Sequence, residues 1–118
     1  MDFLKKVGMF LPSKIERVSW DGEALELACS KLLLRTESTW RISQNNQLIL
    51  ACWDRDSSEL GSRLSGKFLT GISWLIADQP IDLSLKLSDG SSLDIFCCSS
   101  VEAWMLEIKE IGVYFGGQ

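Results

Sequence analysis

Apolar and polar side chains alternate most regularly over residues 82–96, where the pattern predicts an antiparallel β-hairpin. Leucines occupy every second position of the first run, and successive side chains of a strand point to opposite faces. Asp89-Gly90 supplies a dipeptide that tolerates the positive φ of a tight turn, and Leu93 and Ile95 resume the alternation. One face of this hairpin should therefore pack against a core, while the other meets solvent.

Similar patterns along the rest of the chain predict further hairpins and a short helix. The expected elements are a helix within residues 2–10, hairpins over 14–29, 39–53 and 104–115, a helical turn near 58–64 and a strand over 67–77. Turns are expected at Asp21-Gly22 and at the amide cluster 44–46, and Pro80 is placed in a connection. The predicted fold class is α+β, mainly β: an antiparallel sheet of hairpins, curled or partly closed, with a short N-terminal helix.

Length and composition indicate a single domain over residues 1–118. The chain is 46% hydrophobic and 24% charged, as in an ordinary globular protein. The longest apolar runs are far shorter than the roughly 20 residues that span a bilayer. The N-terminal segment lacks the uninterrupted apolar run and small-residue cleavage site of a signal peptide. We therefore expect a cytoplasmic protein that does not bind membranes.

The cysteines point to the same compartment. Cys29, Cys52, Cys97 and Cys98 show no C-x-x-C spacing of the kind found in redox or zinc sites. Isolated cysteines within apolar runs commonly act as small buried hydrophobes. We therefore expect reduced, structural thiols, as is usual in the cytosol.

The residue types argue against common forms of catalysis and metal binding. The chain contains no histidine, which is the commonest general base and zinc ligand and the usual activator of serine or cysteine nucleophiles. Asp54 and Asp56 offer two carboxylates on a polar loop, fewer oxygen ligands than a calcium loop provides. The sequence therefore predicts a protein that is not an enzyme and has no cofactor or metal site.

The hairpin sequence also carries a family resemblance. Residues 82–96 read Asp-Leu-x-Leu-x-Leu-x-Asp-Gly-x-x-Leu-x-Ile-Phe, and Trp104 follows in the next predicted strand. This order resembles small bacterial β-rich domains, some of which are similar to immunity proteins of contact-dependent growth inhibition and other polymorphic toxin systems. The resemblance implies a non-catalytic cytosolic protein that neutralises a cognate toxin domain, often a nuclease, by blocking its active site.

Charge is distributed unevenly along the chain. Residues 1–70 carry ten Lys/Arg and nine Asp/Glu, whereas residues 71–118 carry two and seven. An acidic surface would repel nucleic acid and attract a basic partner, such as a toxin domain that holds phosphates. The candidate partner-binding residues on this surface are Asp78, Asp94, Glu102 and Glu107.

The tryptophans leave two interpretations open. Trp74 and Trp104 continue apolar alternation and are expected in the core, whereas Trp20 and Trp53 stand beside turns and are either core or exposed anchors for a partner. The alternative to an immunity protein is a small interaction module that self-associates through edge strands or exposed aromatics. The expected state is accordingly a monomer or a weak homodimer.

Overall fold

The computed structural model describes residues 2–96 and 104–116, and the fold is mainly β, with 57% strand and 13% helix. The elements are α1 (Phe3–Gly8), β1 (Ser13–Trp20), β2 (Leu25–Cys29), β3 (Leu32–Thr36), β4 (Thr39–Gln44), β5 (Gln47–Ala51), η1 (Ser57–Glu59), α2 (Leu60–Leu64), β6 (Phe68–Ile76), β7 (Gln79–Leu87), β8 (Ser92–Phe96), β9 (Trp104–Ile108) and β10 (Gly112–Gly116). The ten strands form one antiparallel sheet that is not closed. The predicted fold class is therefore confirmed.

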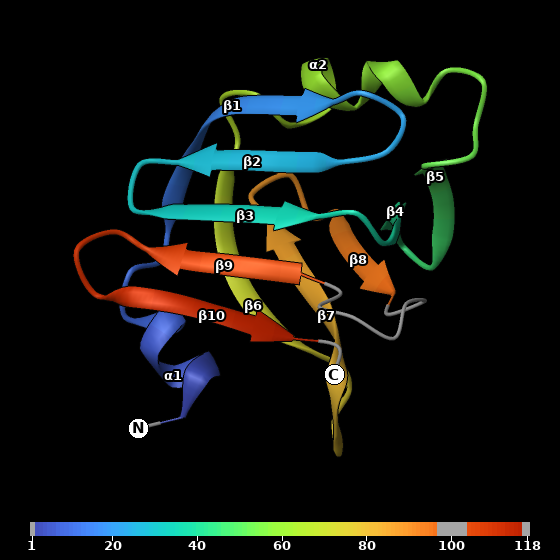
Figure 1. Ribbon diagram of the computed structural model, residues 1–118. Helices are drawn as coiled ribbons and strands as arrows, with labels where there is room; N and C mark the ends of the chain where they lie inside the picture. The colour runs from blue at the N-terminus through green and yellow to red at the C-terminus, as the bar shows by residue number, and fades with distance from the viewer. Residues whose placement is uncertain (1, 97–103, 117–118) are drawn as a thin grey trace.

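The sheet curls into two layers around a single core. Its strand order is β10-β9-β3-β2-β1-β6-β7-β8-β4-β5. Figure 1 shows β1, β2, β3, β9 and β10 as a front layer, with β6 and β7 running steeply behind it. The layers join where β1 pairs with β6 through only two residue pairs, Ser13 with Leu69 and Lys14 with Phe68. The inward-facing side chains of both layers fill the space between them.

The hairpin predicted over residues 82–96 forms from β7 and β8. Leu83 lies opposite Ile95 and Leu85 opposite Leu93, and all four side chains are fully buried. Gly90 adopts a φ of 87°, which a residue with a Cβ rarely tolerates. Alternation and turn chemistry thus act together to set the register of this hairpin.

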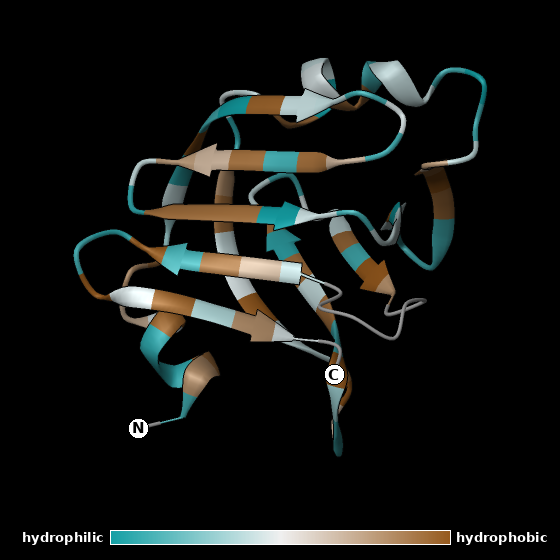
Figure 2. Cartoon of the chain, in the orientation of Figure 1, coloured by the Kyte–Doolittle hydropathy of each residue, from teal (hydrophilic) through white to brown (hydrophobic). Residues whose placement is uncertain are grey.

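Two features differ from the sequence-based expectation. Pro80 is the second residue of β7 rather than part of a connection. It lies where the β6–β7 ladder is irregular, so its missing N–H does not interrupt regular pairing. In addition, β3 was not predicted. Figure 2 shows most of it as a continuous hydrophobic segment, because Leu33 on the outer face is apolar as well.

An aromatic cluster attaches α1 to the sheet. The Asp2 side chain caps the helix by accepting a hydrogen bond from a backbone N–H of its first turn. The Phe3 ring centroid lies 5.9 Å from Trp74, 5.1 Å from Trp104 and 5.2 Å from Tyr114. These contacts hold α1 at the open lower end of the curled sheet (Figure 1). No helix in the described part of the chain is long and apolar enough to cross a membrane.

Candidate functional site

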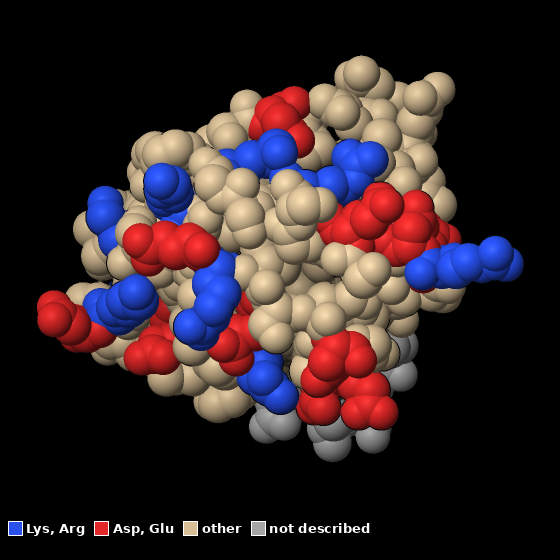
Figure 3. All heavy atoms as spheres, turned by 90° about the horizontal axis from the view of Figure 1, so that it is seen from above, with Lys and Arg blue, Asp and Glu red and all other residues tan. Residues whose placement is uncertain are grey.

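The candidate acidic residues do not share one surface. Asp78 is exposed in the β6–β7 turn, whereas Glu107 is half-buried on the outer face of β9, in the other layer. Asp94 is buried on β8, and Glu102 lies outside the described residues. Figure 3 views the molecule from the end that carries α2 and shows separate acidic groups interspersed with Lys and Arg. The prediction of a single acidic surface is therefore wrong.

Asp94 is held by neighbouring side chains instead of facing solvent. Its exposed fraction is only 3%, although it points to the outer face of the sheet. One carboxylate oxygen accepts a hydrogen bond from Ser84 Oγ at 2.7 Å, and the other accepts from Arg41 Nε at 3.2 Å. The Arg41 guanidinium also lies 4.9 Å from the centroid of the Phe96 ring. Asp94 thus fixes three strands together, and the expectation that it is solvated is wrong.

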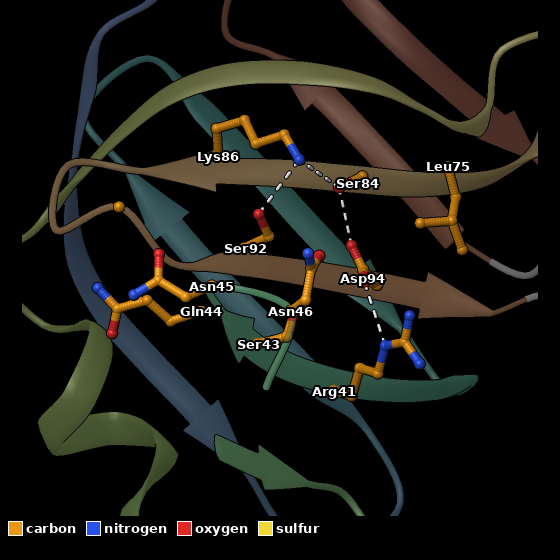
Figure 4. Close-up of a pocket in the computed structure, with 11 residues that line it drawn as sticks. Arg41, Ser43, Gln44, Asn45, Asn46, Leu75, Ser84, Lys86, Ser92 and Asp94 are labelled. Atoms are coloured by element: carbon orange, nitrogen blue, oxygen red, sulfur yellow. Dashed lines mark hydrogen bonds and ion pairs between the residues drawn. The ribbon is translucent and has the colours of Figure 1, made fainter. Parts of the chain in front are cut away.

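Arg41, Ser84 and Asp94 line a polar pocket of about 300 Å³ on the outer face of β4, β7 and β8 (Figure 4). Lys86 Nζ donates to Ser84 Oγ at 3.2 Å and to Ser92 Oγ at 3.1 Å. A continuous chain of polar contacts therefore runs from Lys86 through Ser84 and Asp94 to Arg41. Because these groups satisfy one another, the network stabilises the outer face of the sheet.

Replacing Asp94 with asparagine should lower the free energy of unfolding by about 1–2 kcal/mol, because Arg41 loses its charged partner but is partly exposed to water. Urea unfolding followed by circular dichroism measures this change. Asp78→Asn is the matched control, since Asp78 is exposed in a turn, and it should change stability by less than about 0.5 kcal/mol. Equal unfolding midpoints for the two variants would contradict the assigned role of Asp94.

A second site is more apolar and lies where three connections meet. An open hollow of about 440 Å³ is formed by the β1–β2 turn, the β3–β4 link and the chain that follows β5. These connections lie at the right of Figure 1. We call it the aromatic hollow, and it is lined by Trp20, Gly22, Glu23, Glu37, Ser38, Thr39, Cys52 and Trp53. None of its residues is among the predicted acidic candidates, but its two tryptophans are those for which the sequence allows either a core or an exposed position.

Trp20 forms a fixed wall of the aromatic hollow. Its ring packs edge-on against the buried Trp40, with the centroids 5.2 Å apart. Its indole Nε1 donates a hydrogen bond to Ser57 Oγ at 3.1 Å. Trp20 is thus half-buried and contacts both β4 and η1, so it belongs to the edge of the core.

Trp53 is the exposed member of the pair, with 67% of its surface accessible. The chain around it is nevertheless ordered by hydrogen bonds. Asp54 Oδ2 accepts from the Ala51 N–H at 2.8 Å, and the Cys52 N–H donates to the Trp40 carbonyl oxygen at 3.2 Å. A large aromatic side chain is therefore presented to solvent from a well-defined backbone.

The rim of the aromatic hollow is acidic. Glu23 and Glu37 line it and are both exposed. The neighbouring Asp21 accepts hydrogen bonds from two backbone N–H groups of the β1–β2 turn, at 2.8 Å each. Hydrogen bonds from the Ala24 and Glu23 N–H groups hold the pKa of Asp21 below its ordinary value, so this carboxylate remains charged well into the acidic range. An exposed indole beside carboxylates can hold an apolar group that carries positive charge.

The described cysteines are free thiols. Burial raises the pKa of the Cys29 thiol to about 11, so Cys29 is an unreactive core residue at neutral pH. Cys52 is half-buried in the wall of the aromatic hollow, while Cys97 and Cys98 lie outside the described residues. Within residues 2–96 and 104–116, no group of three or more Cys, Asp or Glu side chains is placed to hold a metal ion.

The chain matches no protein-family model, no curated protein and no solved structure. Its function is therefore inferred from the geometry of the aromatic hollow.

Proposed function

We propose that this protein is a cytoplasmic immunity protein, a non-catalytic inhibitor that binds a bacterial toxin domain and blocks its active site. The observation that carries the proposal is the exposed Trp53 indole in the aromatic hollow, next to Glu23 and Glu37. We therefore propose that the binding surface lies at the end of the sheet where the β1–β2 turn meets the chain after β5.

The exposed aromatic side chain favours a protein as the partner. Binding energy in protein interfaces is concentrated in a few residues, among which tryptophan is enriched. Covering an exposed indole contributes on the order of 3 kcal/mol from apolar area alone. Binding through Trp53 should also cost little conformational entropy, because the backbone on both sides of this residue is already hydrogen bonded.

The charge around the hollow favours a basic partner. Glu23 and Glu37 stand on the rim, and Asp21 adds a third carboxylate in the same turn as Glu23. A nuclease toxin carries positive charge where it holds phosphates, so an acidic rim would speed its approach and occupy its substrate path. The predicted contacts of Asp78, Glu102 and Glu107 remain predictions, and reversing the Asp78 and Glu107 charges tests two of them in the assay below.

The test is co-expression of the tagged protein with the product of the adjacent upstream gene, followed by a salt wash. We expect a toxin domain to be retained stoichiometrically and to harm cells only when this protein is absent. Trp53→Ala should weaken the complex about 10- to 30-fold, because it removes the central aromatic contact. Titration calorimetry of the purified pair measures the loss.

Phe68→Ala is the matched control, because Phe68 is another exposed aromatic side chain but lies outside the aromatic hollow. It should leave the affinity within about twofold. A double reversal of Glu23 and Glu37 to lysine should slow association and flatten its dependence on salt. Retention of a toxin with equal affinity by Trp53→Ala and Phe68→Ala would reject the hollow as the binding surface. Protection against no toxin would reject the immunity function.

A further inference from the structure

β10 forms one edge of the ten-stranded sheet, and β9 is its only partner among the described strands. Figure 1 shows it at the lower border of the front layer. An edge strand presents unpaired N–H and C=O groups that can pair with another strand, and many proteins protect such edges with charged residues or proline. β10 reads Gly-Val-Tyr-Phe-Gly and contains neither.

The opposite edge of the sheet, β5, is protected by a residue that follows the strand. The Ala51 N–H near the end of β5 donates to the Asp54 carboxylate at 2.8 Å, so this backbone donor is already occupied. A charged side chain also stands at that edge and opposes the approach of another strand. Neither edge strand contains a charged residue or proline, but Asp54 occupies a backbone donor of β5, so the two edges differ.

The outer face of β10 carries two exposed apolar side chains. Val113 and Phe115 are 49% and 59% exposed. Phe115 lies opposite the half-buried Met105 on β9, while Val113 lies opposite Glu107, beyond which comes Leu33 on β3. A strand added to β10 would bring its own side chains against Val113 and Phe115, and apolar ones would fit best.

We propose that β10 pairs antiparallel with β10 of a second copy of this chain. The five residues have the same order of residue classes in both directions, Gly, apolar, Tyr, apolar, Gly. When two copies are centred on Tyr114, Val113 of each lies opposite Phe115 of the other, and Gly112 lies opposite Gly116. The strand is thus complementary to itself, as a two-fold symmetric interface requires.

Charge is compatible with this pairing. Among the described residues, the nearest carboxylate on the outer face is that of Glu107, which is one strand away from the edge. In the pair, the two copies of Glu107 are separated by three strand spacings, about 14 Å, which exceeds the Debye length at physiological salt. The two Glu107 carboxylates therefore do not oppose the pairing.

The proposed dimer is weak and leaves the aromatic hollow open. Strands of five residues bury less area than a standard stable interface, so association should depend on concentration. The connections that form the hollow lie at the right of Figure 1, away from the β10 edge. The pairing therefore does not depend on the proposed immunity function, and its test requires no toxin.

Sedimentation velocity of the full chain over a wide concentration range tests the proposal. We expect a monomer that converts to a dimer as concentration rises, and Val113→Lys should lower the association constant at least tenfold. Leu48→Lys is the matched control, because Leu48 is 56% exposed on β5, and it should dimerise like the natural chain. Circular dichroism with urea establishes that both variants remain folded.

Cross-linking tests the register. Oxidising an equal mixture of V113C and F115C variants should give a dimer joined between positions 113 and 115, identified by mass spectrometry of the linked peptides. The proposal is overturned if the natural chain stays monomeric at the highest concentration, if Leu48→Lys abolishes the dimer while Val113→Lys does not, or if the linked peptides come from other positions.

Discussion

Replacing Trp40 with alanine should lower the free energy of unfolding by about 3–5 kcal/mol. The side chain is fully buried on β4, and its neighbour Trp20 packs edge-on against it. Alanine would leave a large cavity there, and Trp20 would lose its main aromatic contact. Because small domains are stable by only about 5–15 kcal/mol, the variant should unfold at a much lower urea concentration, as followed by far-ultraviolet circular dichroism.

Phenylalanine at the same position should have a much smaller effect. The Trp40 indole Nε1 is buried and has no hydrogen-bond partner among the described residues. Leaving such a donor unpaired costs about 1–3 kcal/mol, and Trp40→Phe removes this cost while losing some packing. We therefore expect a net loss below about 1.5 kcal/mol. Similar losses for the alanine and phenylalanine variants would show that the unpaired donor is unimportant.

Gly116→Ala should destabilise the protein by about 2–3 kcal/mol. A Cβ at this position would overlap the indole ring of Trp104, which lies opposite Gly116 on β9. Trp104 cannot move away easily, because it is buried, stacks on Phe3 and donates through Nε1 to the Ile81 carbonyl oxygen at 3.3 Å. The end of β10 must therefore shift, which would weaken its pairing with β9. Urea unfolding monitored by circular dichroism reports the loss.

Gly112→Ala provides the control at the other end of the same strand. A Cβ there would meet no atom within 4 Å, so the substitution should change stability by less than about 0.5 kcal/mol. Both changes remove a glycine from β10, so only the contact with Trp104 distinguishes them. Equal effects of the two substitutions would contradict this explanation.

The hairpins could be predicted because their signals are local. Over residues 82–96, alternating side chains and the Asp89-Gly90 turn agree on one register. The same holds at Asn45 and Asn46, whose positive φ values of 55° and 62° fit the turn expected at the amide cluster. Local patterning and turn chemistry are sufficient for such elements.

β3 and the strand order depend on contacts that the sequence does not make visible. The run of leucines in β3 hides its alternation, because Leu33 on the outer face lies between Ala28 and Glu107 from neighbouring strands. Nothing in the local pattern of β9 indicates that it pairs with β3. The order of strands therefore had to come from the structure.

The environments of the candidate site residues also depend on contacts between distant segments, which the local sequence pattern does not reveal. Asp94 occupies an outward position on β8, so the sequence predicts a solvated carboxylate. It is buried because Arg41 on β4 and Ser84 on β7 lie beside it in the sheet. The environments of Trp20 and Trp53 likewise depend on how three connections meet, although residue type alone marked both as possible anchors.

The pairing of β3 with β9 also has a consequence for folding. In the chain, the five strands β4 to β8 lie between these neighbours, so the front layer requires contacts between distant segments. Such non-local pairing slows folding, since a long loop must close before the contact is gained. During synthesis, β1, β2 and β3 leave the ribosome before β9, so the edge of β3 that pairs with β9 in the folded protein stays unpaired until β9 follows. We therefore expect aggregation during synthesis to begin at Leu32–Thr36.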